Sequence, residues 1–302
     1  MKLQTLFEEK KVVFSLEIFP PKKTSSIQTI YDTLDALRDI EPDFISVTYG
    51  AGGNPADRST VQIASDIKHR YHIEPLAHLS CVNSTKEHIG RVLDDLREND
   101  IENILALRGD LNPNVPPQTD YRYASDLIDD IKQYGGFDIA AACYPEVHPE
   151  AADLEEDLLH LKEKVDAGAT HLISQLFFDN NDYYNFLYRV RQRWMPCTPL
   201  VRQAGITVPI EAGIMPVTNR KQIERMVSLC GASLPKKFVR IMHRYGDDPA
   251  AMQDAGIAYA VEQIVDLISN GVQGIHLYTM NNPLIAHRIN QAVASLIRCS
   301  NR

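Results

Sequence analysis

Short apolar runs rich in β-branched residues alternate with longer stretches of helical periodicity along the whole chain. The short runs predict eight strands, at residues 12–19, 44–49, 76–81, 103–109, 139–144, 171–178, 208–215 and 274–280. Apolar residues at helical spacing predict helices between the strands, at 27–40, 57–71, 86–98, 123–134 and 150–167. A further helix is predicted after the sixth strand, through residue 194.

This order of elements favours a single closed (β/α)8 barrel of the TIM type, with residues 1–302 forming one catalytic domain. Residues 221–270, between the seventh and eighth strands, hold more helical sequence than one crossover needs, so extra helices are expected there. A doubly wound open sheet is the alternative. It is weakened because no Gly-x-Gly-x-x-Gly motif follows any strand.

Composition narrows the classes of function. Of the 302 residues, 44% are hydrophobic and 24% are charged, which is typical of a globular protein with a sizeable core. The net charge of -9 argues against a nucleic-acid-binding protein, which needs a basic face. The richest basic cluster fits one solvated helix face better than a phosphate site; it comprises Lys236, Lys237, Arg240, His243 and Arg244.

The chain shows no sign of secretion or membrane insertion. Residues 1–11 lack the apolar core of a signal peptide, and no segment reaches the roughly 20 apolar residues of a membrane span. The five cysteines are scattered without a Cys-x-x-Cys pair, so a reducing, cytoplasmic setting is expected. His78 and Cys81 have a metal-ligand spacing but no second ligand pair, so no metal site is expected.

The strands end in polar residues. Barrel active sites form at the carboxyl ends of strands, so these residues are candidates for chemistry or binding: Glu17, Thr48, Tyr49, His78, Arg108, Asp110, residues 144–148, Gln175 and Tyr278. Ordinary exposure of strand ends to solvent would explain a polar residue at any one of these positions, but it explains less readily why all of them are polar. Arg108-Gly109-Asp110 stands out because it combines the hydrogen-bond donors of a guanidinium group, the backbone freedom of glycine and a carboxylate. A simple turn after the strand is the alternative.

Glu17 lies in a strand whose neighbours are mostly apolar and which ends at Pro20-Pro21. Such flanks predict a desolvated carboxyl group, and desolvation favours the protonated form that a general acid needs. A salt bridge to Lys22 or Lys23 is the alternative. The chain has no Gly-x-Ser-x-Gly elbow and no cysteine marked as reactive, so a bound organic cofactor is favoured over a nucleophile.

These segments resemble the methylenetetrahydrofolate reductase family, in its bacterial form without a regulatory domain. The resemblance runs in order through nearly the whole chain. Its matching segments are residues 14–22 (FSLEIFPPK), 46–53 (SVTYGAGG), 77–81 (AHLSC), 106–110 (ALRGD), 123–127 (YASDL), 142–151 (ACYPEVHPEA), 161–169 (LKEKVDAGA), 174–179 (SQLFFD) and 212–217 (AGIMPV).

The resemblance implies a β/α barrel that holds FAD at its carboxyl-terminal mouth. It implies ping-pong reduction of 5,10-methylenetetrahydrofolate to 5-methyltetrahydrofolate through flavin N5, with NAD(P)H as the expected donor, in one-carbon metabolism that feeds methionine synthesis. A protein electron donor or partner subunit stays open, and a homo-oligomer is expected. Two alternatives remain: a non-catalytic accessory barrel, and a flavin-free pterin-binding methyl-transfer barrel.

By position, the resemblance implies that Glu17 is the acid that opens the folate ring. Asp110 would lie between flavin and pterin, and Gln175 would hydrogen-bond the folate. FAD would be held by Thr48, His78, Arg108, Gly109, Asp110, Tyr123, Ala124, Tyr144, His148, Asp157, Lys164 and Ala169. Arg108 and Lys164 suit the pyrophosphate, although Lys164 alone would also fit a solvated helix face. Further substrate contacts are implied at Gln222, Met226, Tyr278 and Met280.

The chain departs from the family pattern after the eighth strand. An arginine is frequent there in the family, whereas this sequence reads Tyr278-Thr279-Met280-Asn281-Asn282. Asn282 cannot supply the positive charge, which leaves open how the folate tail or the nucleotide is held. Met226 stands where an aromatic ring can stack on a substrate, so donor preference is not carried over.

Overall fold

The computed structural model describes residues 1–21, 26–49, 59–111, 119–191 and 205–302. Its centre is a closed barrel of parallel strands in sequence order, completed where β1 pairs with β8. The strands are β1 (Val13–Ile18), β2 (Phe44–Val47), β3 (Glu74–Ser80), β4 (Asn103–Leu107), β5 (Asp138–Cys143), β6 (His171–Ser174), β7 (Ile210–Ile214) and β8 (Gly274–Tyr278). The barrel prediction is confirmed, and the doubly wound alternative is wrong.

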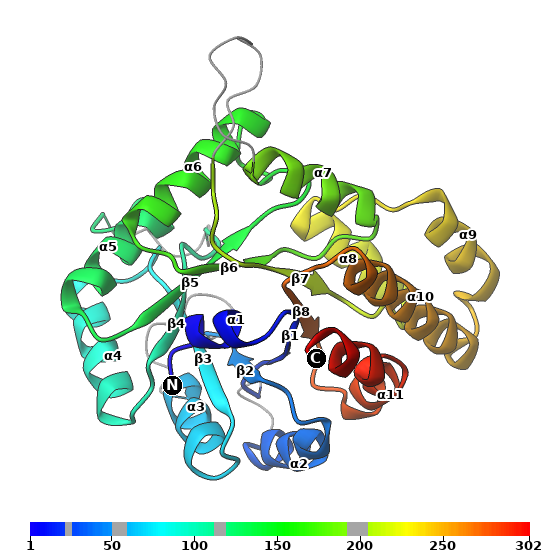
Figure 1. The fold of residues 1–302 in the computed structure, drawn as a ribbon, viewed down its shortest axis with the longest axis horizontal. Helices are drawn as coiled ribbons and strands as arrows, with labels where there is room; N and C mark the ends of the chain where they lie inside the picture. The colour runs from blue at the N-terminus through cyan, green and yellow to red at the C-terminus, as the bar shows by residue number, and fades with distance from the viewer. Residues whose placement is uncertain (22–25, 50–58, 112–118, 192–204) are drawn as a thin grey trace.

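Helices surround the strands (Figure 1). They are α1 (Gln4–Glu9), α2 (Gln28–Leu37), α3 (Ser59–His69), α4 (Lys86–Glu98), α5 (Ala124–Tyr134), α6 (Leu154–Ala167), α7 (Asn180–Arg191), α8 (Arg220–Cys230), α9 (Lys236–Tyr245), α10 (Pro249–Ser269) and α11 (Pro283–Ser300). The extra helical segment between β7 and β8 is confirmed as α8, α9 and α10. No helix in the described ranges is long and apolar enough to cross a membrane.

Some boundaries differ from the predictions. The helix predicted at 27–40 changes to a 3₁₀ turn at Arg38–Ile40, and β6 ends at Ser174 rather than at Phe178. Residues 176–178 are apolar because Leu176 and Phe178 pack with α8 and α9 in a second core and Phe177 packs in the main core, not because the strand continues. The predicted extension of the α7 helix to residue 194 lies outside the described residues.

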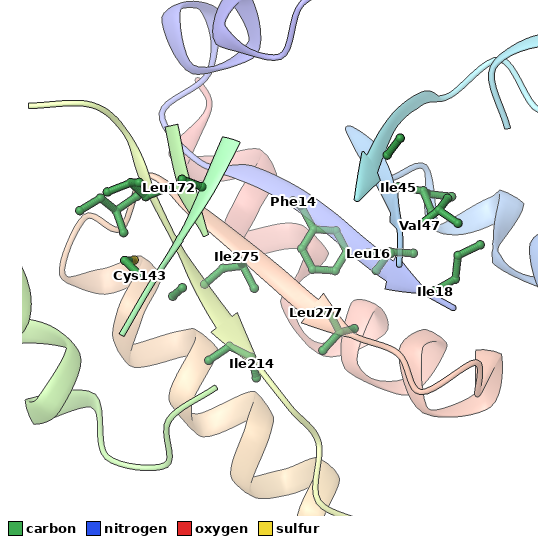
Figure 2. Close-up of a cluster of buried hydrophobic side chains, with 14 of the residues drawn as sticks. Phe14, Leu16, Ile18, Ile45, Val47, Cys143, Leu172, Ile214, Ile275 and Leu277 are labelled. Atoms are coloured by element: carbon green, nitrogen blue, oxygen red, sulfur yellow. The ribbon is translucent and has the colours of Figure 1, made fainter. Parts of the chain in front are cut away.

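The two faces of each strand have different roles. Phe14, Leu16 and Ile18 project from one side of β1 into the core between strands and helices (Figure 2). Ser15 and Glu17 therefore face the barrel interior, because successive side chains of a strand alternate. The helix α1 was not among the predicted elements. Leu6 of this helix and its N-cap residue Leu3 join an apolar cluster with inward residues of several strands.

The basic cluster of residues 236–244 lies on α9, where its five basic side chains are exposed. Phe238 and Met242 of the same helix are buried against the second core. The solvated helix face predicted from the spacing is confirmed.

Candidate active site

Glu17 ends β1 inside the barrel, with its side chain 16% exposed. One of its carboxylate oxygens, Oε2, lies 3.6 Å from Nε2 of His78 and 3.5 Å from Nε2 of His276. The carboxyl group is therefore surrounded by histidines and not by the apolar residues that flank it in the sequence, because Leu16 and Ile18 point away from the barrel interior. The proposed partners Lys22 and Lys23 lie outside the described residues.

His78, on β3, is a buried neutral imidazole. Burial lowers its pKa to about 4, and its Nε2 has no hydrogen-bond partner among the described residues. Because His78 is neutral near pH 7, it places no positive charge beside the Glu17 carboxyl group.

The loop after β4 presents Arg108, Gly109 and Asp110 at the mouth of the barrel. Gly109 has φ +86°, and a Cβ there would come within 3.1 Å of Cβ of Ser80. The position favours glycine, because the positive φ strains other residues and the space beside Ser80 is tight. Asp110 is exposed, whereas Arg108 donates from both terminal nitrogens to the carboxylate of Glu150, at 2.6 Å each.

The loop after β5 is tied to the first turn of α6. The backbone N–H of His148 donates to Oδ2 of the buried Asp157 at 3.2 Å, and burial raises the pKa of that carboxyl group. The ring of His148 meets the ring of Tyr144 edge to face, with 4.6 Å between centroids. Tyr144 and His148 are thus brought together on one loop, as the strand-end pattern predicted.

Lys164, near the end of α6, does not lie on a solvated face. Its Nζ donates to the carbonyl of Ala142 in β5 at 2.6 Å, and desolvation lowers its pKa. Ala169 is buried where α6 leads into β6, and its N–H donates to the carbonyl of Lys164. The solvated alternative for Lys164 is wrong because the side chain turns inward.

The remaining predicted cofactor residues lie beside the other strand ends. Thr48 follows β2, and its N–H donates to the carbonyl of Ile18 at 3.1 Å. Tyr123 and Ala124 begin α5, and the Tyr123 N–H is capped by Asp126. The carbonyl of Tyr123 also accepts a weak contact from Sγ of Cys81, which joins α5 to β3.

Gln175 and Tyr278 are fixed by the ends of β6 and β8. The Gln175 side chain accepts from the N–H of Leu176, and the Tyr278 hydroxyl donates to the Ser174 carbonyl at 2.8 Å. Gly213 of β7 makes room for this bond, since a Cβ there would lie 2.2 Å from the same carbonyl. Gln175 shares a pocket with Tyr144 and Cys230.

Three predicted substrate residues come from the segments after β7 and β8. Gln222 is in the first turn of α8, and Met226 is one turn further along the same helix. Met280 follows β8 with φ +52°, and both methionines pack against the second core. These residues lie in the segments that follow β7 and β8.

Asn282 has a structural role in place of the family arginine. It is the N-cap of α11, and its side chain accepts from the N–H of Ile285 at 3.3 Å. Thr279 and Asn281, which attach this loop to β1, were not among the predicted site residues. Thr279 donates to the Glu17 carbonyl at 2.6 Å, while the Asn281 amide bonds both backbone groups of Phe19.

Three buried polar residues beneath Glu17 were also missed. Ser15, Glu211 and His276 are fully buried on the inward faces of β1, β7 and β8. Alternation could have revealed Ser15 and His276, because each lies two residues before a predicted site residue, Glu17 or Tyr278. Nothing in its own segment predicts that Glu211 joins them.

Solved structures similar to this chain show the same fold. One is described as an uncharacterized protein from Clostridium thermocellum that binds two copies of 5-methyl-5,6,7,8-tetrahydrofolic acid; it aligns with a TM-score of 0.66 at 12% identity, over 99% of this chain and 100% of that one. An oxaloacetate acetylhydrolase aligns with a TM-score of 0.53 at 11% identity, over 98% and 86% of the two chains.

Sequence comparison identifies relatives of this chain more specifically than similarity of fold does. The chain is 37% identical over 288 residues to the 5,10-methylenetetrahydrofolate reductase of Escherichia coli K12, covering 95% of this chain and 92% of that protein. It is 36% identical over 287 residues to the enzyme of the same name from Pectobacterium carotovorum, with the same coverage. It also matches methylenetetrahydrofolate reductase (NADH) 1 of Arabidopsis thaliana at 34% identity, over 93% of this chain and 48% of that protein.

A family model described as methylenetetrahydrofolate reductase matches residues 2–294. The match takes in all eight strands of the barrel and the polar groups at their carboxyl ends. The chain belongs to the methylenetetrahydrofolate reductase family.

Proposed function

We propose that the protein is an FAD-dependent reductase that converts 5,10-methylenetetrahydrofolate to 5-methyltetrahydrofolate, with NAD(P)H as the electron donor. The observation that carries the proposal is the place of Glu17. Its carboxyl group lies inside the barrel at the end of β1, beside a neutral histidine and open in part to the mouth. Family membership supports the choice of substrate.

The residues at the mouth fit a flavin nucleotide. Gly109 has a positive φ that glycine adopts without strain, and its lack of a side chain suits close approach of a ligand to the backbone. The buried Nε2 of His78 has no partner among the described residues, and it can serve a polar group of a ligand. Arg108 and Lys164 are cations suited to a pyrophosphate.

FAD, when bound, supplies a two-electron carrier that accepts hydride from the nicotinamide and passes it to the folate in ping-pong order. We assign its binding to the residues around β2 to β6. They are Thr48, His78, Arg108, Gly109, Asp110, Tyr123, Ala124, Tyr144, His148, Asp157, Lys164 and Ala169. Asp157 acts through the His148 backbone, which it holds by a hydrogen bond.

Glu17 supplies a proton to the folate. Its carboxyl group protonates one nitrogen of the five-membered ring, and the bond from that nitrogen to the methylene carbon breaks. The electron pair of this bond stays on the protonated nitrogen, which leaves an electrophilic iminium carbon to receive hydride. Glu17 is then a carboxylate and must regain a proton before the next turnover.

Asp110 and Gln175 orient the substrate. An exposed carboxylate at the mouth can accept hydrogen bonds from the amino-pyrimidine edge of the pterin. Gln175 presents an amide next to the pocket it shares with Tyr144. Gln222, Met226, Tyr278 and Met280 complete the substrate side. The fixed hydroxyl of Tyr278 helps to keep the β8 end of the site rigid.

The test is the visible spectrum of the purified protein, recorded anaerobically before and after addition of 5-methyltetrahydrofolate. A flavin spectrum that bleaches is expected, because the folate half-reaction runs in reverse. A flavin that stays oxidised would remove the folate assignment. A protein that remains colourless after incubation with FAD would overturn the flavoenzyme proposal and favour a flavin-free barrel.

A further inference from the structure

A chain of polar side chains runs from the barrel interior to Glu17. The hydroxyl of Ser15 lies 2.8 Å from Oε2 of Glu211 and 2.7 Å from Nδ1 of His276. Nε2 of His276 lies 3.5 Å from Oε2 of Glu17 and 3.4 Å from the hydroxyl of the buried Ser46. Glu211, Ser15 and His276 are fully buried, so within the described part of the protein Glu17 is the partly exposed end of this chain.

The barrel is shaped to admit this chain. Glu211 faces Gly274 in the pairing of β7 with β8, and a Cβ at Gly274 would lie 2.6 Å from Cγ of Glu211. Ser15 pairs with His276 in the register of β1 and β8, while Glu17 comes one inward step later on β1. The space for a carboxyl group therefore depends on a glycine in the neighbouring strand.

A carboxyl group at this depth is costly for the fold. Oε1 of Glu211 has no hydrogen-bond partner among the described residues. Burial raises the pKa of Glu211 to about 7, against the smaller opposing effects of His276 and Ser15. The group therefore exchanges its proton near neutral pH. An apolar residue would pack this position without an unpaired oxygen, so stability alone does not explain Glu211.

We propose that Glu211, Ser15 and His276 are positioning residues that return a proton to Glu17 through the barrel interior. The proposal rests on the proposed function, since Glu17 needs this proton only if it gives one to the folate. It deepens that function by adding a buried proton store to the acid at the mouth.

The transfer balances at each atom. Protonated Glu211 gives its proton to Oγ of Ser15, which passes its own hydrogen to Nδ1 of His276. His276 releases the hydrogen on Nε2 to the Glu17 carboxylate and ends as the other neutral tautomer. Glu211 ends ionised, Glu17 ends protonated, and Ser15 is unchanged. When the mouth is open to solvent, Glu17 passes a proton back along the same path to Glu211, and Glu17 then takes up a proton from water, so that both carboxyl groups end protonated.

Other ionisable groups also face the two carboxyl groups. Glu17 is flanked by His78 of β3 and Tyr278 of β8, in addition to His276. His78 is neutral near pH 7, and the Tyr278 hydroxyl is engaged with the Ser174 carbonyl. Neither connects Glu17 to a further proton store.

Glu211 interacts electrostatically with Asp43, just before β2, and with Tyr183 of α7, as well as with His276. Tyr183 donates to the Ile210 carbonyl, and the Asp43 carboxylate accepts from the N–H of Phe14. Of these groups, His276 is the one joined to Glu211 through Ser15 by short contacts.

The first test compares the two half-reactions of the FAD-loaded enzyme across pH 6–9. In Glu211→Gln we expect the folate half-reaction to slow by about tenfold towards high pH, where solvent supplies few protons. Flavin reduction by NAD(P)H should change less than about twofold. Ser15→Ala keeps both ionisable groups and should give the same profile. The matched control is His287→Gln, a half-buried histidine of α11 that bonds the Ala36 carbonyl outside the barrel interior and should keep the native profile.

The second test needs no activity. In ¹⁵N-histidine NMR of the intact chain, the ring-nitrogen shifts of His276 should follow the ionisation of Glu211, whose pKa burial raises to about 7, and this dependence should be lost in Glu211→Gln. Active protein with native pH profiles in both Glu211→Gln and Ser15→Ala would overturn the proposal. So would His276 signals unaffected by Glu211→Gln. Absence of folate reduction in the native protein, with this titration intact, would defeat the proposed function while supporting the Glu211–His276 link.

Discussion

Arg108 is held by Glu150 through two parallel hydrogen bonds, each 2.6 Å long. The pair joins the loop after β4 to the loop after β5, and Glu150 remains half exposed. Arg108 is also the cation assigned to the pyrophosphate of FAD. The carboxylate therefore occupies the guanidinium edge that a phosphate would use, and the two anions compete for it.

Glu150→Gln should strengthen FAD binding. The exposed ion pair contributes little, so we expect the Kd for FAD to fall by up to about fivefold. Fluorescence titration of the apoprotein with FAD measures the change. Glu224→Gln, which breaks the exposed pair with Arg220, is the control and should have no effect. Weaker FAD binding in Glu150→Gln would show that Glu150 orients Arg108 for the cofactor instead of competing with it.

Glu17→Gln should abolish folate reduction selectively. An amide cannot donate the proton that opens the folate ring, so the folate half-reaction should fall by about 10²–10⁴-fold. Stopped-flow absorbance measures each half-reaction separately, and flavin reduction by NAD(P)H serves as the internal control. Loss of both half-reactions would contradict the role of Glu17 as the folate-side acid.

Asp110→Asn should slow the folate half-reaction. A hydrogen bond to a charged acceptor is worth about 1.5–3 kcal/mol, which corresponds to about 10–100-fold in rate or affinity. Single-turnover oxidation of the reduced enzyme by methylenetetrahydrofolate measures it. Asp247→Asn, at an exposed position beyond α9, is the control. Native rates in Asp110→Asn would remove this carboxylate from the mechanism.

Gly213→Ala should destabilise the barrel. The added Cβ would lie 2.2 Å from the Ser174 carbonyl and 2.8 Å from the Tyr278 hydroxyl, so the β6–β8 contact must shift. Overpacking of this kind costs about 1–3 kcal/mol, measurable by urea unfolding. Gly90→Ala in α4 is the opposite control, since nothing lies within 4 Å and alanine favours the helix by about 0.5–1 kcal/mol. Equal stabilities of the two variants would contradict this packing.

His171→Gln should flatten the loss of stability in acid. Burial lowers the pKa of His171 to about 4 in the folded chain, against an ordinary value of 6.5. Between these values the unfolded chain binds a proton that the folded chain does not, so stability falls as pH decreases from 6.5 to 4. Removing the group should reduce this loss by on the order of 3 kcal/mol, read from urea unfolding at several pH values. An unchanged acid slope would refute the depressed pKa.

The order and type of the elements could be read from the sequence because they depend on local periodicity. Apolar runs such as residues 13–18 and 274–278 repeat with helices between them, and right-handed β/α units of this number close into a barrel. The strand-end residues Glu17, His78 and Arg108 were predictable for the same reason, since all parallel strands deliver their carboxyl ends to one mouth. The assignment of roles came from the family motifs that these residues share.

The tertiary structure decided which side chains meet. Local sequence did not show that Glu150 pairs with Arg108 or that Lys164 turns towards β5. Glu211 lies 196 residues from Ser15, and their contact depends on barrel closure and on the space left by Gly274. Periodicity fixes the direction of a side chain within its own strand. Strand tilt, register and packing, which involve the whole barrel, fix the partner it finds there.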